Sequence, residues 1–161
     1  MTVVSDTSVI SNLYLSGYLD LLPDLFPSIV IPQKVHEELL ALNQFGIDVQ
    51  PIAQASFLAV KMPANQPFVQ TLMKTLDEGE AQAISLAVEI HADLLVIDEL
   101  KGRAIAFQNG LKITGLLGLL VRAKQKGILS KVQPVMDMLR TKANFFISAK
   151  LYAQISQLAG E

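Results

Sequence analysis

Two aspartates stand shortly after apolar runs, where strands of a parallel sheet would end. Asp6 comes after Val3-Val4, and Asp98 comes directly after the run from Leu94 to Ile97. In doubly wound sheets, ligands bind outside the carboxyl ends of the strands, so both carboxylates are placed for chemistry. Each aspartate also precedes a predicted helix, and capping that helix is the alternative role for either residue.

Glu38 lies on the apolar side of a predicted helix at residues 33–42. At 100° per residue, it shares one stripe with Val35, Leu39 and Leu42. A carboxylate that faces the interior is costly unless it is paired, protonated or bound to a metal. The alternative is a glutamate at the edge of the stripe that reaches water.

Glu80 lies on the apolar stripe of a later helix, which we expect from Asp77 to about His91. The same stripe holds Ala83 and Ile84. Glu80 also stands at the third helical position after Asp77, as in a capping box, and this is its alternative role. The opposite face of the helix carries polar residues, namely Gln82, Ser85 and Glu89.

These four acids gain meaning as a group. Carboxylates gathered in one pocket repel one another, which raises some of their pKa values, and a divalent cation removes the repulsion. Mg2+ and Mn2+ prefer oxygen ligands, and Mg2+ keeps several of its waters. Such a site can polarise a phosphodiester, lower the pKa of a bound water and stabilise the leaving oxygen. The pattern therefore indicates an acidic Mg2+ or Mn2+ site.

The elements that must position these acids alternate between strands and helices up to about residue 114. We expect strands at 3–4, 29–31, 94–97 and 111–113. We expect helices at 8–22, 33–42, 67–76, 77–91, 99–108, 115–126, 131–139 and 148–158, while 43–66 shows no clear pattern. The alternation predicts an α/β fold, in which helices cover both faces of a parallel sheet and a helical C-terminal tail follows.

Length and composition narrow the class of protein. A chain of 161 residues that is 51% hydrophobic predicts one domain, residues 1–161, with a core at about 1–127 and a tail at about 128–161. The lack of cysteine excludes disulfides and thiolate zinc sites, and with no leader it favours the cytoplasm. The longest apolar run, Leu116 to Val121, is too short for a bilayer, so no membrane partner is expected.

Charge is divided unevenly along the chain. Residues 1–100 carry 3 Lys or Arg and 13 Asp or Glu, whereas residues 101–161 carry 10 and 2. Ordinary solvated helix faces are one explanation. The functional interpretation is an acidic pocket for cations beside a basic flank that attracts an anionic polymer.

Four motifs, in order and at suitable spacing, resemble those of PIN domains. They are Ser5-Asp6-Thr7-Ser8, Ile31-Pro32-(x)2-Val35-(x)2-Glu38-Leu39, Gly79-Glu80-Ala81-(x)-Ala83-Ile84 and Ile97-Asp98-Glu99-(x)3-Arg103. The tail is similar to a subgroup of PIN-like proteins of uncharacterised function. There the matching segments are Thr114-Gly115-(x)2-Gly118, Ala123-Lys124-(x)2-Gly127 and Ser148-(x)2-Leu151-Tyr152. The resemblance covers nearly the whole chain.

The resemblance implies a three-layer α/β/α sandwich that hydrolyses single-stranded RNA with Mg2+ or Mn2+. Many family members are toxins of the VapC type, held inactive by a cognate antitoxin and often dimeric. A ribonuclease, and in particular the toxin of a toxin–antitoxin pair, is therefore the leading expectation. An antitoxin protein and a second copy of the chain are the expected protein partners.

The resemblance also assigns roles to individual residues. Asp6 and Asp98 would be direct metal ligands, and Glu80 would complete the shell or act through water. Glu38 would orient a bound water or a second ion. Supporting roles fall to three further residues, namely Ser8 as a hydrogen-bond donor to Asp6, Glu99 as a possible extra ligand and Arg103 as a contact to phosphate. The alternatives are a helix-dipole role for Glu99 and an ion pair between Glu99 and Arg103.

Two other function classes remain open from the residues. A PIN-like module could bind RNA or a partner protein without useful turnover, since Glu80 stands where many active toxins have aspartate. A receiver-type phosphoryl-transfer domain also gathers acids at strand ends. It is disfavoured because no second aspartate accompanies Asp6 and no lysine follows a later strand in a suitable place.

Overall fold

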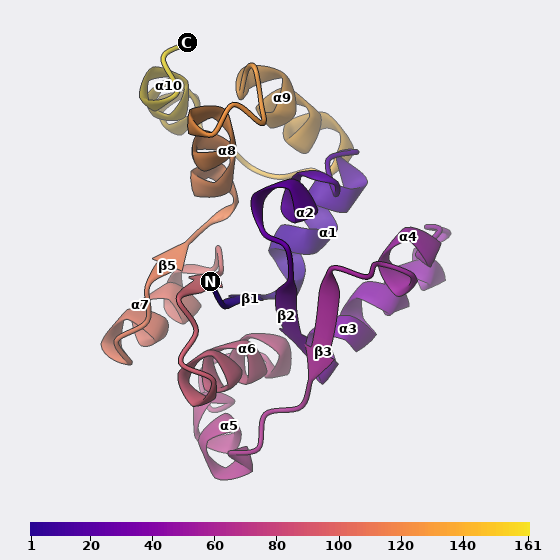
Figure 1. Ribbon diagram of the computed structural model, residues 1–161, viewed down its shortest axis with the longest axis vertical. Helices are drawn as coiled ribbons and strands as arrows, with labels where there is room; N and C mark the ends of the chain where they lie inside the picture. The colour runs from indigo at the N-terminus through magenta and orange to yellow at the C-terminus, as the bar shows by residue number, and fades with distance from the viewer.

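The fold is built on a central sheet of five parallel strands. The computed structural model describes all 161 residues. The strands are β1 (Val3–Ser5), β2 (Ile29–Pro32), β3 (Leu58–Lys61), β4 (Leu94–Val96) and β5 (Ile113–Thr114). Their order is β3-β2-β1-β4-β5, and all pairs are parallel (Figure 1). The chain reverses its direction of travel across the sheet between β1 and β4, which makes this pair the topological switch point.

Helices connect the strands and extend beyond them. They are α1 (Thr7–Leu15), α2 (Leu21–Leu25), α3 (Gln33–Leu40), the 3-10 helix η1 (Ala41–Phe45), α4 (Gln50–Ala53), α5 (Gln66–Leu72), α6 (Glu78–Glu89), α7 (Leu100–Gln108), α8 (Leu116–Gln125), α9 (Gln133–Lys142) and α10 (Ala149–Leu158). No helix combines the length and the apolar composition that crossing a membrane requires.

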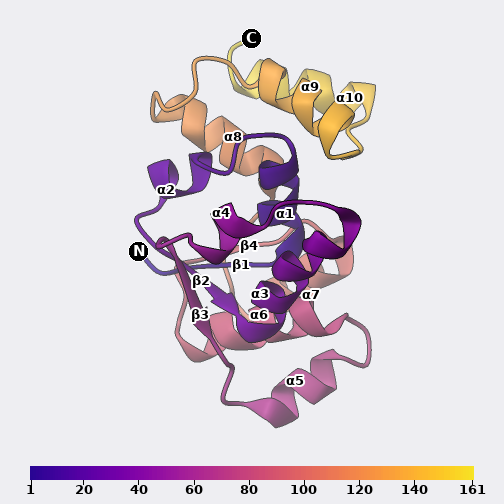
Figure 2. The same ribbon diagram turned by 90° about the vertical axis from the view of Figure 1, so that its right-hand side faces the viewer.

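Alternating strand side chains divide the core into two layers. Val3 and Val96 face a larger cluster that includes residues of α1, α2, α3 and α8. Val4 and Leu95 face a smaller cluster with residues of α5, α6 and α7. Figure 2 shows α8, α9 and α10 on the opposite side of the sheet from α5. The expected three-layer α/β/α sandwich is therefore confirmed.

The C-terminal helices pack onto the larger layer. Val135, Met136 and Leu139 of α9 are buried in the same cluster as Val9 and Leu13 of α1. At the end of the chain, the Glu161 side chain accepts hydrogen bonds at the start of α9 and pairs with a lysine of α8. Burial and polar contacts thus both attach the tail to the sheet.

Two expectations about local structure are wrong. The helix expected at 8–22 is two helices, because the chain turns at Gly17 with a φ of +87°, a conformation that glycine adopts readily. The segment 43–66 contains β3, which the sequence does not suggest. β3 is an edge strand whose side chains are half-buried or exposed, so it lacks the apolar pattern of the inner strands.

Two of the three polar residues opposite the apolar stripe of α6 are buried, because this helix is covered almost all round. Gln82 and Ser85 are only 5% and 1% exposed. The helices α3, α5 and α7 cover the sides of α6 that do not face the sheet. Gln82 remains satisfied, because its side chain accepts a hydrogen bond of 3.2 Å from the backbone N–H of Lys34. That bond fixes α6 against the first turn of α3, and both helices carry predicted site residues.

Candidate functional site

Asp6 lies at the centre of the sheet, directly after β1. Its backbone N–H donates to the carbonyl of Val96 at 3.1 Å, which ties the end of β1 to the end of β4. Its side chain caps α1 by accepting from the N–H of Val9 at 3.3 Å, and it also accepts from the Ser8 hydroxyl. Asp6 is therefore the helix cap that the sequence allowed, and Ser8 supports it as expected.

The carboxyl group of Asp6 is poorly solvated. Asp6 is only 3% exposed, and burial raises its pKa to about 7. The hydrogen bond from Val9 opposes this rise in pKa, whereas the negative charge of Asp98 adds to it. A buried carboxylate with like charges nearby is stabilised by a bound cation.

A cavity of about 320 Å3 collects Asp6 and several other predicted residues. Every residue that lines it is polar or acidic, and none is a lysine or arginine. The lining residues are Asp6, Thr7, Ser8, Ser11, Glu38, Asp77, Glu80 and Glu99. Three of the four predicted acids, with Ser8 and Glu99, are thus brought together from α1, α3 and α6 and from the segments that precede α6 and α7.

Glu38 reaches this cavity from α3, as its place on the apolar stripe predicts. Val35 and Leu39 beside it are fully buried. Its Oε1 atom is buried and makes no hydrogen bond of ordinary geometry. Burial raises the pKa of Glu38, and the negative charge of Asp77 raises it further, whereas Lys34 and the nearby Thr7 hydroxyl lower it. The alternative of a glutamate that escapes to water is not realised for this oxygen.

Glu80 reaches the cavity from the first turn of α6. Its backbone N–H donates to Asp77 at 2.8 Å, so Asp77 caps the helix as expected. The Glu80 carboxylate does not return a bond to the backbone of Asp77, and its Oε2 atom is buried without a partner. Burial raises the pKa of Glu80 to about 8, with Asp77 contributing. The capping box is only half formed, which leaves the Glu80 side chain free for the cavity.

Asp98 differs from the role that its position suggests, because it does not cap the helix that follows it. Glu99 caps α7 instead, accepting from the N–H of Gly102 at 2.9 Å. Asp98 Oδ1 accepts a hydrogen bond of 2.8 Å from the N–H of Leu116. This bond gives a partner to the first backbone N–H group of α8. The Oδ2 atom of Asp98 is buried and unpartnered. Burial raises the pKa of Asp98, whereas the Leu116 bond and Arg103 lower it.

Asp98 and Arg103 line a second cavity of about 420 Å3, which shares no lining residue with the first. The Arg103 guanidinium donates to the carbonyl of Ile97 at 2.9 Å and forms no ion pair with Glu99. The alternative of an ion pair between these two residues is therefore wrong. Arg103 lies beside Asp98, close enough to lower its pKa.

Three residues that line the acidic cavity were not predicted as site residues from the sequence. Asp77 was explained as a helix cap, and nothing in the sequence marks Ser11. Thr7 carries a buried hydroxyl oxygen without a partner, and its place between Asp6 and Ser8 was the available signal. Hydroxyl and carboxylate oxygens are thus the only side-chain polar atoms that this cavity offers.

The donor set fits a hard divalent cation. Buried polar atoms normally have partners, yet one carboxylate oxygen in each of Glu38, Glu80 and Asp98 has none. Oxygen ligands suit Mg2+ or Mn2+, which also keep waters in their coordination shells. No three His, Cys, Asp or Glu side chains form a group that could hold a metal. Asp6, Glu38 and Glu80 line one cavity, and Asp98 lines the second.

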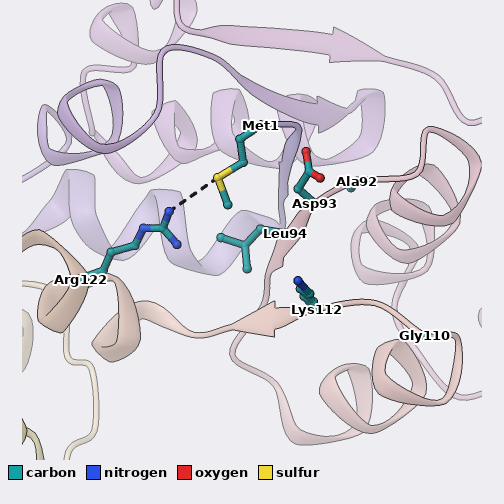
Figure 3. A pocket seen from close by; sticks show the side chains of 7 residues that line it. All are labelled: Met1, Ala92, Asp93, Leu94, Gly110, Lys112 and Arg122. Atoms are coloured by element: carbon teal, nitrogen blue, oxygen red, sulfur yellow. Dashed lines mark hydrogen bonds between the residues drawn. The ribbon is translucent and has the colours of Figure 1, made fainter.

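The opposite edge of the sheet has a different character. A cavity of about 660 Å3 lies there, beside the amino ends of β1, β4 and β5. Figure 3 shows Lys112 and Arg122 among its lining side chains, together with Asp93. The Arg122 guanidinium reaches the sulfur of Met1 and lies over the ring of Phe26. None of the predicted site residues lines this cavity.

Comparison with known proteins gives one clear result. A family model described as a PIN domain matches residues 2–161. No curated protein and no solved structure matches the chain. The match spans nearly the whole sequence and confirms the resemblance that the four acidic motifs indicate.

Proposed function

Because the chain belongs to the PIN-domain family, we propose that it is a metal-dependent endoribonuclease that cuts single-stranded RNA. The observation that carries this proposal is the set of buried, unpartnered carboxylate oxygens of Glu38, Glu80 and Asp98 around the switch point of the sheet. Buried carboxylates without partners lower the stability of a fold. In a nuclease, the same carboxylates would bind the metal ion that the reaction needs. Mg2+ or Mn2+ is the proposed cofactor.

Each acid has a proposed task. Asp6, Glu80 and Asp98 would hold the cation, which supplies charge stabilisation at the phosphate when bound. Glu38 would orient the attacking water or a second ion, and burial raises its pKa. Ser8 keeps the Asp6 carboxylate in place, and Glu99 is an additional candidate ligand. Arg103 would contact a phosphate of the RNA.

The reaction is a hydrolysis in which water adds its oxygen to phosphorus. The water loses a proton, one P–O bond breaks, and the leaving oxygen takes up a proton, so the reaction consumes one water for each bond cut. A second phosphate contact from Arg103 would orient the strand for in-line attack.

The test is cleavage of a mixed single-stranded RNA pool with Mg2+ or Mn2+ and with chelator. Wild type would be compared with Asp6→Asn and Asp98→Asn, and with Asp20→Asn as a matched control. Asp20 is exposed and its side chain makes no capping bond. We expect metal-dependent cutting by the wild type and the control, and a loss of at least about a hundredfold in the two site variants. Equal cutting by all four proteins would reject the proposed site.

The second candidate is a binding module that holds RNA or a partner protein without turnover. The lack of a ready-made group of three metal ligands favours it, as does glutamate at position 80. RNA binding by the wild type without any cleavage would support this candidate.

Partners and location are finer parts of the proposal. We propose that the chain acts in the cytoplasm as a homodimer, and as a toxin that a cognate antitoxin inhibits. Light scattering of the purified protein would test the dimer. Co-purification with a small protein encoded beside it, together with loss of cleavage in that complex, would test the antitoxin.

A further inference from the structure

The acidic cavity cannot bind a strand of RNA by itself. It contains the side chains of Asp6, Glu38, Asp77, Glu80 and Glu99, and no lysine or arginine. Every nucleotide of RNA carries a negative charge, so only the phosphate next to the metal has reason to approach these acids. The remainder of a bound strand must therefore contact a neighbouring surface of different chemistry.

Such a surface begins at Asp98. The cavity of about 420 Å3 lies between the end of β5, the start of α8 and α10, and its volume is in the range of ligand sites. Its lining residues are Asp98, Arg103, Ile113, Thr114, Gly115, Leu117, Gly118, Phe145, Leu151 and Ile155. We call it the Phe145 groove. It lies near the acidic cavity, because Asp98 is close enough to Asp6 for its negative charge to raise the pKa of Asp6.

The groove combines a cation with an apolar wall. Arg103 donates to a backbone carbonyl and forms no salt bridge, although its positive charge lowers the pKa of the neighbouring Asp98. The Thr114 hydroxyl adds a group that can donate or accept. Phe145 and Ile155 supply apolar surface, and Gly118 presents no side chain. A positive charge beside an aromatic ring suits a phosphate and the flat base attached to it.

The aromatic ring is held on a well-anchored loop. The N–H of Phe145 donates to the carbonyl of Leu139 at 3.0 Å. Arg140 donates to the carbonyl of Ile147 at 2.7 Å and lies over the ring of Tyr152. Because these bonds fix the loop on both sides of Phe145, the ring is in place before any ligand binds, which reduces the entropic cost of binding.

We propose that the Phe145 groove binds the unpaired base next to the scissile phosphate, with that base against Phe145 and a backbone phosphate at Arg103. The proposal rests on the proposed nuclease function and deepens it. A base within a duplex stays in its stack and is not free to enter the groove, so the groove selects single-stranded RNA.

An abasic scan tests this subsite. A single-stranded RNA with one mapped cut site would be prepared with a single base removed at each position in turn. Binding and metal-dependent cleavage would be measured for wild type, Phe145→Ala and Phe145→Leu. We expect one position beside the cut where removal of the base costs the wild type about tenfold. Phe145→Ala should lose a similar factor on intact RNA and become insensitive to that abasic position.

Two controls separate the groove from general effects. Phe45→Ala removes a phenylalanine that is 79% exposed and remote from both cavities. Lys112→Ala removes a positive charge at the opposite edge of the sheet (Figure 3). Arg103→Ala removes the positive charge in the groove. Both controls should keep the wild-type abasic profile. Phe145→Leu keeps apolar volume and distinguishes lost stacking from lost folding.

The outcomes distinguish the two proposals. Cleavage with a flat abasic profile, or identical profiles for Phe145→Ala and Phe45→Ala, overturns the subsite and leaves the nuclease standing. Absence of both cleavage and binding in the wild type overturns both. Binding without cleavage, but with the expected sensitivity to Phe145, supports the subsite and rejects the nuclease.

Discussion

The buried acids differ in how much of their hydrogen-bonding capacity is used. Asp6 accepts a hydrogen bond from the backbone N–H of Val9, and Asp98 accepts one from the backbone N–H of Leu116. Both bonds satisfy N–H groups in the first turn of a helix, which is a common structural role. Glu38 and Glu80 each keep a buried oxygen without a partner. Fold stability alone would favour apolar residues there, so these glutamates are the clearest mark of function at the scale of single residues.

Stability of the metal-free protein should depend on pH through Asp6 and Glu80. Asp6 has a pKa of about 7 when folded against 3.8 ordinarily, and Glu80 has about 8 against 4.5. Both folded pKa values are raised, so their contribution to stability is complete below the ordinary values. It is lost as the pH rises through about 7 and 8. The melting temperature should therefore fall as the pH rises from about 5 to about 8.

Thermal unfolding in chelator across this pH range measures the effect. Asp6→Asn should flatten the profile, since it removes one of the two titrating groups. Mg2+ should restore stability at the alkaline end, because the cation needs ionised ligands. A melting temperature that rises steadily with pH would contradict the assignment of raised pKa values.

Gly79 should control the position of the Glu38 carboxylate. A Cβ atom at position 79 would collide with Oε1 of Glu38, the far end of a flexible side chain. Gly79→Ala should thus leave the fold intact, move that carboxylate and lower cleavage by about tenfold.

A double-variant cycle makes the Gly79 prediction specific. In a Glu38→Gln background, Gly79→Ala should have a much smaller effect on cleavage, because the carboxylate it displaces is already gone. Cleavage measured for both single variants and the double variant gives the coupling. Fully additive losses would show that Gly79 acts without Glu38.

At the scale of elements, the inner strands were easier to predict than the edge. The apolar runs that become β1, β2 and β4 are buried, so their composition reveals them. β3 lies at the edge with half-exposed side chains and carried no such pattern. The break after α1 depends on Gly17, a single residue within an otherwise helical stretch.

The acidic site was predictable to a similar degree. The position of Asp6 after a strand, and of Glu38 and Glu80 on apolar helix stripes, predicted that these three side chains lie together. All three line one cavity. The capping partners were harder, because Asp98 bonds to Leu116, a residue that follows in sequence only after α7 and β5. Contacts between segments far apart in the chain leave no signature in local spacing.

That contact gives Asp98 a structural role that can be separated from chemistry. Asparagine keeps an oxygen that accepts from the N–H of Leu116, whereas alanine does not. Asp98→Ala should lower the free energy of unfolding by about 1 kcal/mol relative to Asp98→Asn. Both variants should lose cleavage. Urea unfolding, measured together with the cleavage assay, checks this prediction. Equal free energies of unfolding for the two variants would show that Asp98 does not stabilise the start of α8.

At the scale of the whole molecule, acidic and basic residues are concentrated in different parts of the fold. The acids gather at the carboxyl edge of the sheet, while the last 61 residues carry most of the Lys and Arg. The tail packs on the larger core layer and contributes Phe145, Leu151 and Ile155 to the groove beside Asp98. The proposed cation site and the proposed surface for an anionic strand therefore lie near each other.

The most direct test of the proposed metal site is a titration of the intact protein with Mn2+, followed by electron paramagnetic resonance. Wild type and Asp20→Asn should bind Mn2+ with the same affinity, whereas Asp6→Asn and Asp98→Asn should bind at least about tenfold more weakly. Binding that is absent from the wild type, or unchanged in all three variants, would contradict a metal site built from these carboxylates.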